Sequence, residues 1–189
     1  MASIIEKSIR TVVTKAVGAV AGMNRKRMPK LNAGNPYLIG LNQPMTEEKT
    51  IESLTVVGEI PRELDGRYMR IGPNPVFAPD PNSYHWFTGE GMAHGVRIKN
   101  GTALWYRNRW VRSNLVSKSL GEEPALGARN PRADNANTNI IAINGRTFAI
   151  VEAGAFPVEL EDGLDTLKHN PFDGTLGGSF SAHPHLDSA

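Results

Sequence analysis

The residues best suited to chemistry in this 189-residue chain are its five histidines, because the chain holds no cysteine. The lack of cysteine excludes disulfides, zinc–thiolate centres, iron–sulfur clusters and a cysteine nucleophile, and it is consistent with a reducing compartment. His183 and His185 are separated only by Pro184. In an extended strand, residues i and i+2 point the same way, so both imidazoles could face one metal ion. Imidazole ligands suit iron, zinc, copper and nickel. The alternative is a polar turn at the end of a strand.

Other candidate motifs are weaker. His85 and His94 flank a glycine-rich turn, and we expect both to be hydrogen-bonded structural residues. The run Gly89-Glu90-Gly91 precedes a predicted strand instead of a helix, and its third glycine is misplaced for a dinucleotide-binding loop. The chain has neither a Walker loop nor a Gly-x-Ser-x-Gly nucleophile elbow.

Charge divides the chain into a basic leader, residues 1–33, and a body, residues 34–189. The leader carries seven basic residues against one acidic residue, a net charge of +6. Because the whole chain carries +2, the body carries −4. A mildly acidic body argues against a nucleic-acid surface. No run of 18 apolar residues is present, so the sequence predicts no membrane-spanning helix.

The leader is predicted to contain an amphipathic helix over residues 3–21. Its apolar residues recur at helical spacing; they are Ile5, Ile9, Val12, Ala16 and Val20. A basic amphipathic helix of this kind can lie on an anionic membrane surface, which would place residues 3–27 in peripheral contact with a bilayer. The alternatives are a solvated leader or a helix packed on its own domain. We expect a cytoplasmic protein.

The body is predicted to be all-β. Asn100-Gly101 and Asn144-Gly145 each separate two β-rich runs, and Asn-Gly between such runs is a strong hairpin signal because both turn positions need positive φ. We therefore expect Met92–Lys99 to pair with Thr102–Val111, and Ile140–Ile143 to pair with Arg146–Glu152. A long loop, Ser113–Asn137, should join these hairpins. The pattern by itself leaves a sandwich, a barrel and a propeller open.

Several segments together resemble the amino-terminal third of the carotenoid cleavage oxygenases, in that family's order and at compatible separations. These are GRYMRIGPNP (66–75), YHWFTGEGMAHG (84–95), YRNRWVR (106–112), NTN (137–139), Glu152, FDG (172–174) and AHP (182–184). The resemblance extends from about residue 35 to the end of the chain. Residues 84–96 and 105–112 are most similar to bacterial members of the family.

The resemblance implies the amino-terminal part of a seven-bladed β-propeller in which four histidines hold Fe(II) on the propeller axis. With O2, such an enzyme cleaves a conjugated C=C bond of a carotenoid or apocarotenoid into two carbonyl products. His183, which precedes the proline, matches the first iron ligand, and His185 lies at a variable position. Glu152 matches a glutamate that holds a ligand histidine. Because Phe148, Ile150 and Glu152 alternate along a predicted strand, we expect the Glu152 carboxylate to be buried and to need a partner. The alternative is a surface glutamate at the end of a strand.

Two departures from the family pattern qualify this interpretation. The chain is less than half the family's length, so we expect an amino-terminal fragment of two or three blades that is inactive alone. Val151 stands where the stilbene-cleaving branch has a lysine that binds the phenol oxygen, which favours a carotenoid or apocarotenoid substrate. Stilbene cleavage and isomerase activity remain alternatives within the family. Outside enzymes, the alternative is a module that binds a polyene or a partner without catalysis.

Overall fold

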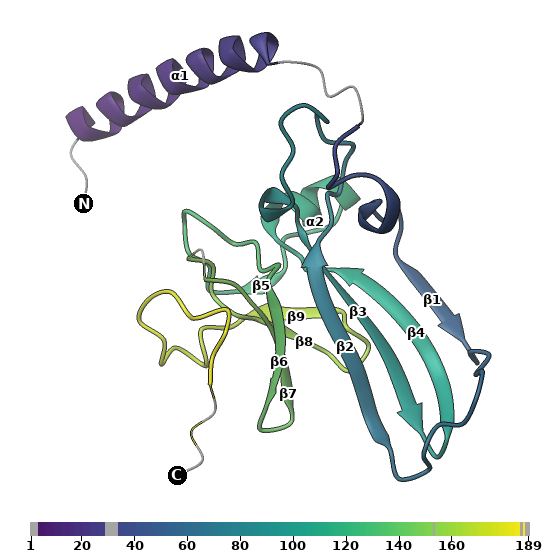
Figure 1. The fold of residues 1–189 in the computed structure, drawn as a ribbon. Coiled ribbons are helices and arrows are strands. Elements are labelled where there is room, and N and C mark those ends of the chain that lie inside the picture. Colours follow the sequence, from purple (N-terminus) through teal and green to yellow (C-terminus); the bar gives the residue numbers. More distant parts are fainter. Residues whose placement is uncertain (1–3, 29–33, 153, 186, 188–189) are drawn as a thin grey trace. The chain divides into compact units, whose positions relative to one another are not determined.

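The computed structural model describes residues 4–28, 34–152, 154–185 and 187. Their regular secondary structure is mainly β, with nine strands, two α-helices and two short 3-10 helices (Figure 1). The chain forms two compact units, Met1–Gln43 with Pro79–Tyr84 and Pro44–Ala78 with His85–Ala189.

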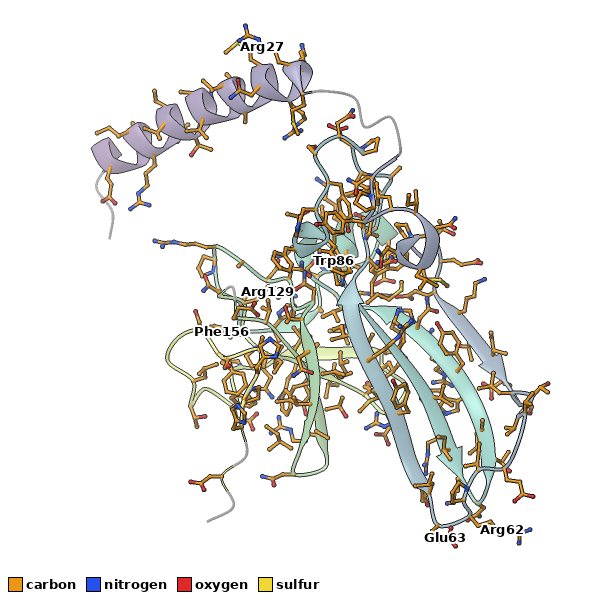
Figure 2. The ribbon with its side chains drawn as sticks, in the orientation of Figure 1. Arg27, Arg62, Glu63, Trp86, Arg129 and Phe156 are labelled. Carbon is orange, nitrogen blue, oxygen red and sulfur yellow. The ribbon has the colours of Figure 1, made fainter. Side chains whose placement is uncertain are left out.

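The first unit contains helix α1, Ile4–Arg27, and the short 3-10 helix η1, Gly40–Asn42. The predicted leader helix is therefore confirmed, and it continues through the basic cluster to Arg27 (Figure 2). Three basic residues in the last turn and Glu6 in the first complement the helix dipole. Ile9, Val13 and Val20 are each more than half exposed, so the described apolar side chains of α1 face solvent. Within the described residues, no helix is long and apolar enough to cross a membrane.

A four-stranded antiparallel sheet begins the second unit. It consists of β1 (Lys49–Glu52), β2 (Asp65–Pro73), β3 (Gly91–Lys99) and β4 (Thr102–Trp110), in the order β1-β4-β3-β2. The 3-10 helix η2, Trp86–Thr88, lies between β2 and β3 in the sequence.

A second sheet of five strands follows along the chain. It consists of β5 (Leu126–Gly127), β6 (Asn139–Ile143), β7 (Arg146–Ile150), β8 (Val158–Leu160) and β9 (Thr166–His169), in the order β5-β9-β8-β7-β6. The pairing of β5 with β9 is parallel and the other pairings are antiparallel.

Both predicted hairpins are confirmed. β3 pairs with β4 across Asn100-Gly101, and β6 pairs with β7 across Asn144-Gly145. All four turn residues have φ between 49° and 76°, which is the left-handed region that a two-residue type I′ turn requires. The last strand of each hairpin is shorter than predicted, because β4 ends at Trp110 and β7 ends at Ile150.

The main core lies between the two sheets. Ala93 of β3 is fully buried in one cluster with Ala149 of β7 and Val158 of β8. A Cβ added at Gly95 would lie only 3.0 Å from Leu164 Cδ1. Small side chains on β3 therefore allow the close approach of residues from the second half of the chain. Ile71 of β2 packs against the same cluster, so this core holds the two sheets together.

The predicted loop Ser113–Asn137 contains a second helix, which the all-β prediction missed. Helix α2, Asn114–Leu120, begins after Ser113, whose Oγ accepts a hydrogen bond from the Val116 backbone N–H. The helix ends at Gly121, which has φ 71°. Val116 packs in a second core cluster with Met92 and Trp110. Such a short helix is stabilised mainly by tertiary packing and leaves a weak periodic signal in the sequence.

Candidate functional site

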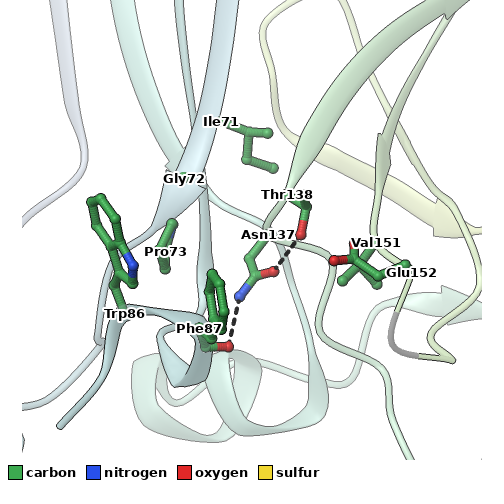
Figure 3. A pocket seen from close by; sticks show the side chains of 9 residues that line it. All are labelled: Ile71, Gly72, Pro73, Trp86, Phe87, Asn137, Thr138, Val151 and Glu152. Atoms are coloured by element: carbon green, nitrogen blue, oxygen red, sulfur yellow. Dashed lines mark hydrogen bonds between the residues drawn. The ribbon is translucent and has the colours of Figure 1, made fainter. Parts of the chain in front are cut away.

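A pocket of about 330 Å3 in the second unit contains one of the two predicted site residues, Glu152 (Figure 3). Most of its walls are apolar or aromatic, and among the described residues Glu152 is the only titratable one that lines it. The residues that line the pocket are Ile71, Gly72, Pro73, Trp86, Phe87, Asn137, Thr138, Val151 and Glu152.

Four segments far apart in the sequence meet at this pocket. Ile71–Pro73 end β2, Trp86 and Phe87 belong to η2, residues 137–138 precede β6, and residues 151–152 follow β7. The pairing of Asn139 with Ile150, and the hydrogen bond from Thr138 N–H to Ile150 O at 3.2 Å, place the start of β6 beside the end of β7.

Asn137 joins two of these segments. Its Nδ2 donates to Gly89 O at 2.8 Å and to Phe87 O at 3.4 Å, while its Oδ1 accepts a hydrogen bond of 3.1 Å from Thr138 Oγ1 (Figure 3). Because these bonds satisfy the buried amide, Asn137 stabilises the wall formed by η2. The Asn-Thr-Asn run is one of the segments that carry the family resemblance, but the sequence alone assigned it no role.

Glu152 differs from expectation in its burial. The prediction that Glu152 extends a strand with Phe148 and Ile150 on a buried face is wrong, because β7 ends at Ile150 and Glu152 is exposed. Val151, by contrast, is only 6% exposed and belongs to the main core. Buried Val151 thus anchors the chain in the core, and the next residue, exposed Glu152, places its carboxylate at the pocket.

His183 lies in an irregular segment and not in a strand. The prediction assumed that strand alternation makes the side chains of His183 and His185 point the same way, and this assumption does not hold here. Both histidines are exposed, whereas Ala182 is 1% exposed. The peptide bond that joins Ala182 to His183 is held at both of its polar groups: the His183 N–H donates to Ser181 Oγ at 3.1 Å, and Ala182 O accepts from Asn139 Nδ2 at 2.9 Å. His183 does not line the pocket that contains Glu152.

The histidines predicted to be structural are indeed hydrogen-bonded. His85 Nδ1 accepts from Phe87 N–H at 3.2 Å and caps η2. His94 Nδ1 lies 2.9 Å from the Tyr106 hydroxyl oxygen. Burial, together with the nearby Arg70 guanidinium, lowers the pKa of His94 to about 4. The imidazole of His94 is therefore neutral near pH 7.

His169, at the end of β9, is the most buried histidine among the described residues. Its Nε2 lies 2.9 Å from Arg112 O, and burial lowers its pKa. Its Nδ1 is buried without a hydrogen-bond partner in the described part of the chain.

A metal ion would need ligands beyond these residues. In the described ranges, no group of three or more His, Asp or Glu side chains is placed to hold a metal ion. His183 fits the role of one ligand, since its imidazole is exposed and makes no hydrogen bond to another described side chain. A complete imidazole site would therefore take its remaining ligands from outside this part of the chain.

Comparison with known proteins places this fold in a family. Residues 42–189 match the model of the retinal pigment epithelial membrane protein family. The chain is 51% identical over 157 residues to a carotenoid cleavage oxygenase of Mycobacterium tuberculosis, an alignment that covers 81% of this chain and 31% of that protein. The chain belongs to the carotenoid cleavage oxygenase family. The resemblance inferred from the motifs is thus confirmed.

Two solved enzyme structures share the fold. A lignostilbene dioxygenase of Pseudomonas brassicacearum superposes with a TM-score of 0.68 at 28% identity, covering 85% of this chain and 35% of the enzyme. A variant of the Synechocystis apocarotenoid oxygenase superposes with a TM-score of 0.64 at 27% identity, covering 77% of this chain and 34% of that one. The chain therefore spans about a third of the length of the family members that it matches.

Proposed function

We propose that the full-length protein is an Fe(II)-dependent dioxygenase that cleaves a conjugated C=C bond of a carotenoid or apocarotenoid. This chain would supply two or three blades of a seven-bladed β-propeller, one iron ligand and one carboxylate that holds another ligand. The observation that carries the proposal is the apolar pocket in which Val151 and Glu152 stand side by side, in a chain of the carotenoid cleavage oxygenase family.

His183 is the proposed iron ligand. Its backbone is anchored while its imidazole remains exposed, an arrangement that suits a side chain whose partner comes from elsewhere in the full-length protein. The chemistry that Fe(II) supplies when bound is activation of O2, whose oxygen atoms end in the two carbonyl products. Neutral imidazoles are suitable ligands for this metal.

Glu152 is the proposed positioning carboxylate. A carboxylate that accepts the far N–H of a ligand imidazole fixes the ring's tautomer and orientation, and it raises the basicity of the coordinating nitrogen. The histidine that Glu152 would hold is expected to lie outside this chain, which is consistent with a carboxylate that is exposed here. Loss of such a partner commonly weakens metal affinity or activity by about 10- to 100-fold.

The pocket favours a hydrocarbon substrate. Ile71, Phe87 and Val151 offer apolar surface, and a volume of about 330 Å3 is at the small end of the range for ligand sites. We infer that it receives one segment of a polyene and that the rest of the protein completes the walls. Val151 cannot hydrogen-bond a phenol oxygen, which argues against stilbenes.

Stilbene cleavage is the second candidate, because one of the superposed structures is a lignostilbene dioxygenase. The two are separated by offering the purified full-length protein an apocarotenal and a hydroxylated stilbene at equal concentration. Faster formation of aldehyde products from the apocarotenal is expected. Preferential cleavage of the stilbene would overturn the substrate assignment without affecting the reaction type.

The leader is proposed to bring a cytoplasmic enzyme to the bilayer that holds its apolar substrate. Helix α1 exposes Ile9, Val13 and Val20, and it ends in the basic residues 25–27. Apolar burial and attraction to anionic lipid act together in such helices. Without its membrane and without the remaining ligands, the isolated chain is expected to be inactive.

The decisive experiment compares His183→Ala with His185→Ala in the full-length protein. Both histidines are exposed and lie on the same segment, so His185→Ala is a matched control for local disturbance. We expect His183→Ala to lose bound iron and cleavage activity, and His185→Ala to retain most of both. Stoichiometric iron and full turnover in His183→Ala would refute the ligand assignment. If the wild-type protein bound polyene tightly without iron and without turnover, a non-catalytic binding role would replace the proposed one.

A further inference from the structure

The side chain of Asn139 connects the segment of His183 to the sheet. Its Nδ2 donates to Ala182 O at 2.9 Å, across 43 residues of sequence. Its Oδ1 accepts from Ile140 N–H at 2.8 Å. Because one end of the amide accepts and the other donates, the two bonds also fix which way the amide is oriented.

Asn139 is the first residue of β6 and lies opposite the end of β7 that leads to the pocket. It pairs with Ile150, the last residue of β7, after which the chain continues directly to Val151 and Glu152. Asn139 therefore pairs through its backbone with the strand that leads to Glu152, and it bonds through its side chain to the segment of His183.

Other contacts hold the histidine segment without fixing the peptide at His183. Phe180 packs against Phe172 with ring centroids 4.8 Å apart, and Phe172 packs against Phe148 of β7 at 5.2 Å. These rings attach the segment three residues before His183. The Ser181 hydroxyl accepts the His183 N–H, but it belongs to the same segment. Among the described residues, Asn139 provides the side-chain hydrogen bond that links the peptide carbonyl next to His183 to a strand.

We propose that Asn139 is a positioning residue for His183, an inference that rests on the proposed function. Asn139 holds the Ala182 carbonyl, which limits rotation of the peptide that leads into His183 and presents the imidazole in one direction. A ligand that is already ordered loses less conformational entropy on binding a metal ion. Without the donor, the Ala182 carbonyl is left unsatisfied beside a buried methyl group.

Asn139→Asp is a sharp test, because it keeps the shape and the acceptor for Ile140 N–H but removes the donor to Ala182 O. Asn130→Asp is a matched control. Asn130 Nδ2 donates to Gly154 O at 2.7 Å, and its Oδ1 accepts from Arg132 N–H at 3.0 Å. The control thus removes the same kind of amide donor from a backbone carbonyl, while it keeps an acceptor for a nearby backbone N–H, in a different loop.

The first measurement is amide hydrogen exchange of this 189-residue chain. We expect faster exchange in residues 181–185 of Asn139→Asp but not of Asn130→Asp, with protection of β6 and β7 retained in both. Unchanged exchange in residues 181–185 would overturn the anchoring role. If Asn139→Asp loses protection throughout β6, Asn139→Ser replaces it, because its shorter side chain also withdraws the amide from Ala182 O.

The second measurement is the affinity of the full-length apoprotein for Fe(II) under anaerobic conditions, with the thermal midpoint of the apoprotein measured in parallel. We expect about a 10-fold weaker affinity in Asn139→Asp than in Asn130→Asp, in line with the loss of other positioning groups around metal ligands. A purely structural role would lower both midpoints alike and leave the affinities equal, and this result would overturn the proposal. If His183→Ala binds iron as the wild type does, the proposed function fails instead.

Discussion

His94 is predicted to make the stability of this chain fall as the pH decreases below neutrality. Burial and Arg70 lower its pKa from the ordinary value of 6.5 to about 4, so the folded chain holds the imidazole neutral where the unfolded chain protonates it. The loss of stability therefore begins near pH 6.5, grows as the pH falls, and levels off near pH 4, where the folded state also binds the proton.

The size of the effect follows from these two values. At pH 5 the unfolded imidazole is protonated in a ratio of about 30 to 1, whereas about one folded molecule in ten carries the proton. Linkage then gives a loss of about 2 kcal/mol relative to neutral pH. His94 is only partly buried, so solvent screening reduces the expected loss to about 1 kcal/mol.

Urea unfolding at pH 7.5 and pH 5.0 measures this loss, with tryptophan fluorescence as the signal because Trp105 and Trp110 lie in β4, the strand that pairs with the strand of His94. His94→Gln removes the titration, and His185→Gln, at an exposed position, is the control. The wild type and His185→Gln should each lose about 1 kcal/mol more between the two pH values than His94→Gln does. An equal loss in all three proteins would refute the reasoning, because His169 and the carboxylates titrate identically in each.

Three further predictions test the fold and the leader. Gly91→Ala should destabilise the second unit by about 3 kcal/mol in urea unfolding, because its Cβ would lie 1.9 Å from Ala136 O. Gly66→Ala is the control and should cost little, because its Cβ would meet no atom within 4 Å. Similar midpoints for the two variants would show that the close approach is wrong. Gly145→Ala should cost about 1 kcal/mol in the same assay, from the φ of +73° alone, since no atom lies within 4 Å of its Cβ. Deletion of residues 1–33 should reduce co-sedimentation with vesicles that contain anionic lipid and leave the low background on neutral vesicles unchanged; equal sedimentation with and without the leader would refute membrane contact.

Local sequence determined the elements whose causes act over a few residues. The two Asn-Gly pairs specified their hairpins because few residues tolerate positive φ at both turn positions, and the structure has all four in that region. The 3.6-residue period of the leader specified α1. The family motifs were equally local, and their order along the chain was enough to identify the family that the comparisons confirm.

Only the tertiary structure decided what depends on distant residues. Helix α2 was missed because its stability comes from packing Val116 against Met92 and Trp110, which no local period reveals. The exposure of Glu152 depends on where β7 loses its partner, and alternation along a strand does not give the end of pairing. The bond from Asn139 to Ala182 spans 43 residues, and the pocket takes its walls from four segments. Contacts of this kind exist only once the sheets have packed, so the sequence identified the residue types of the site while the fold determined which of them meet.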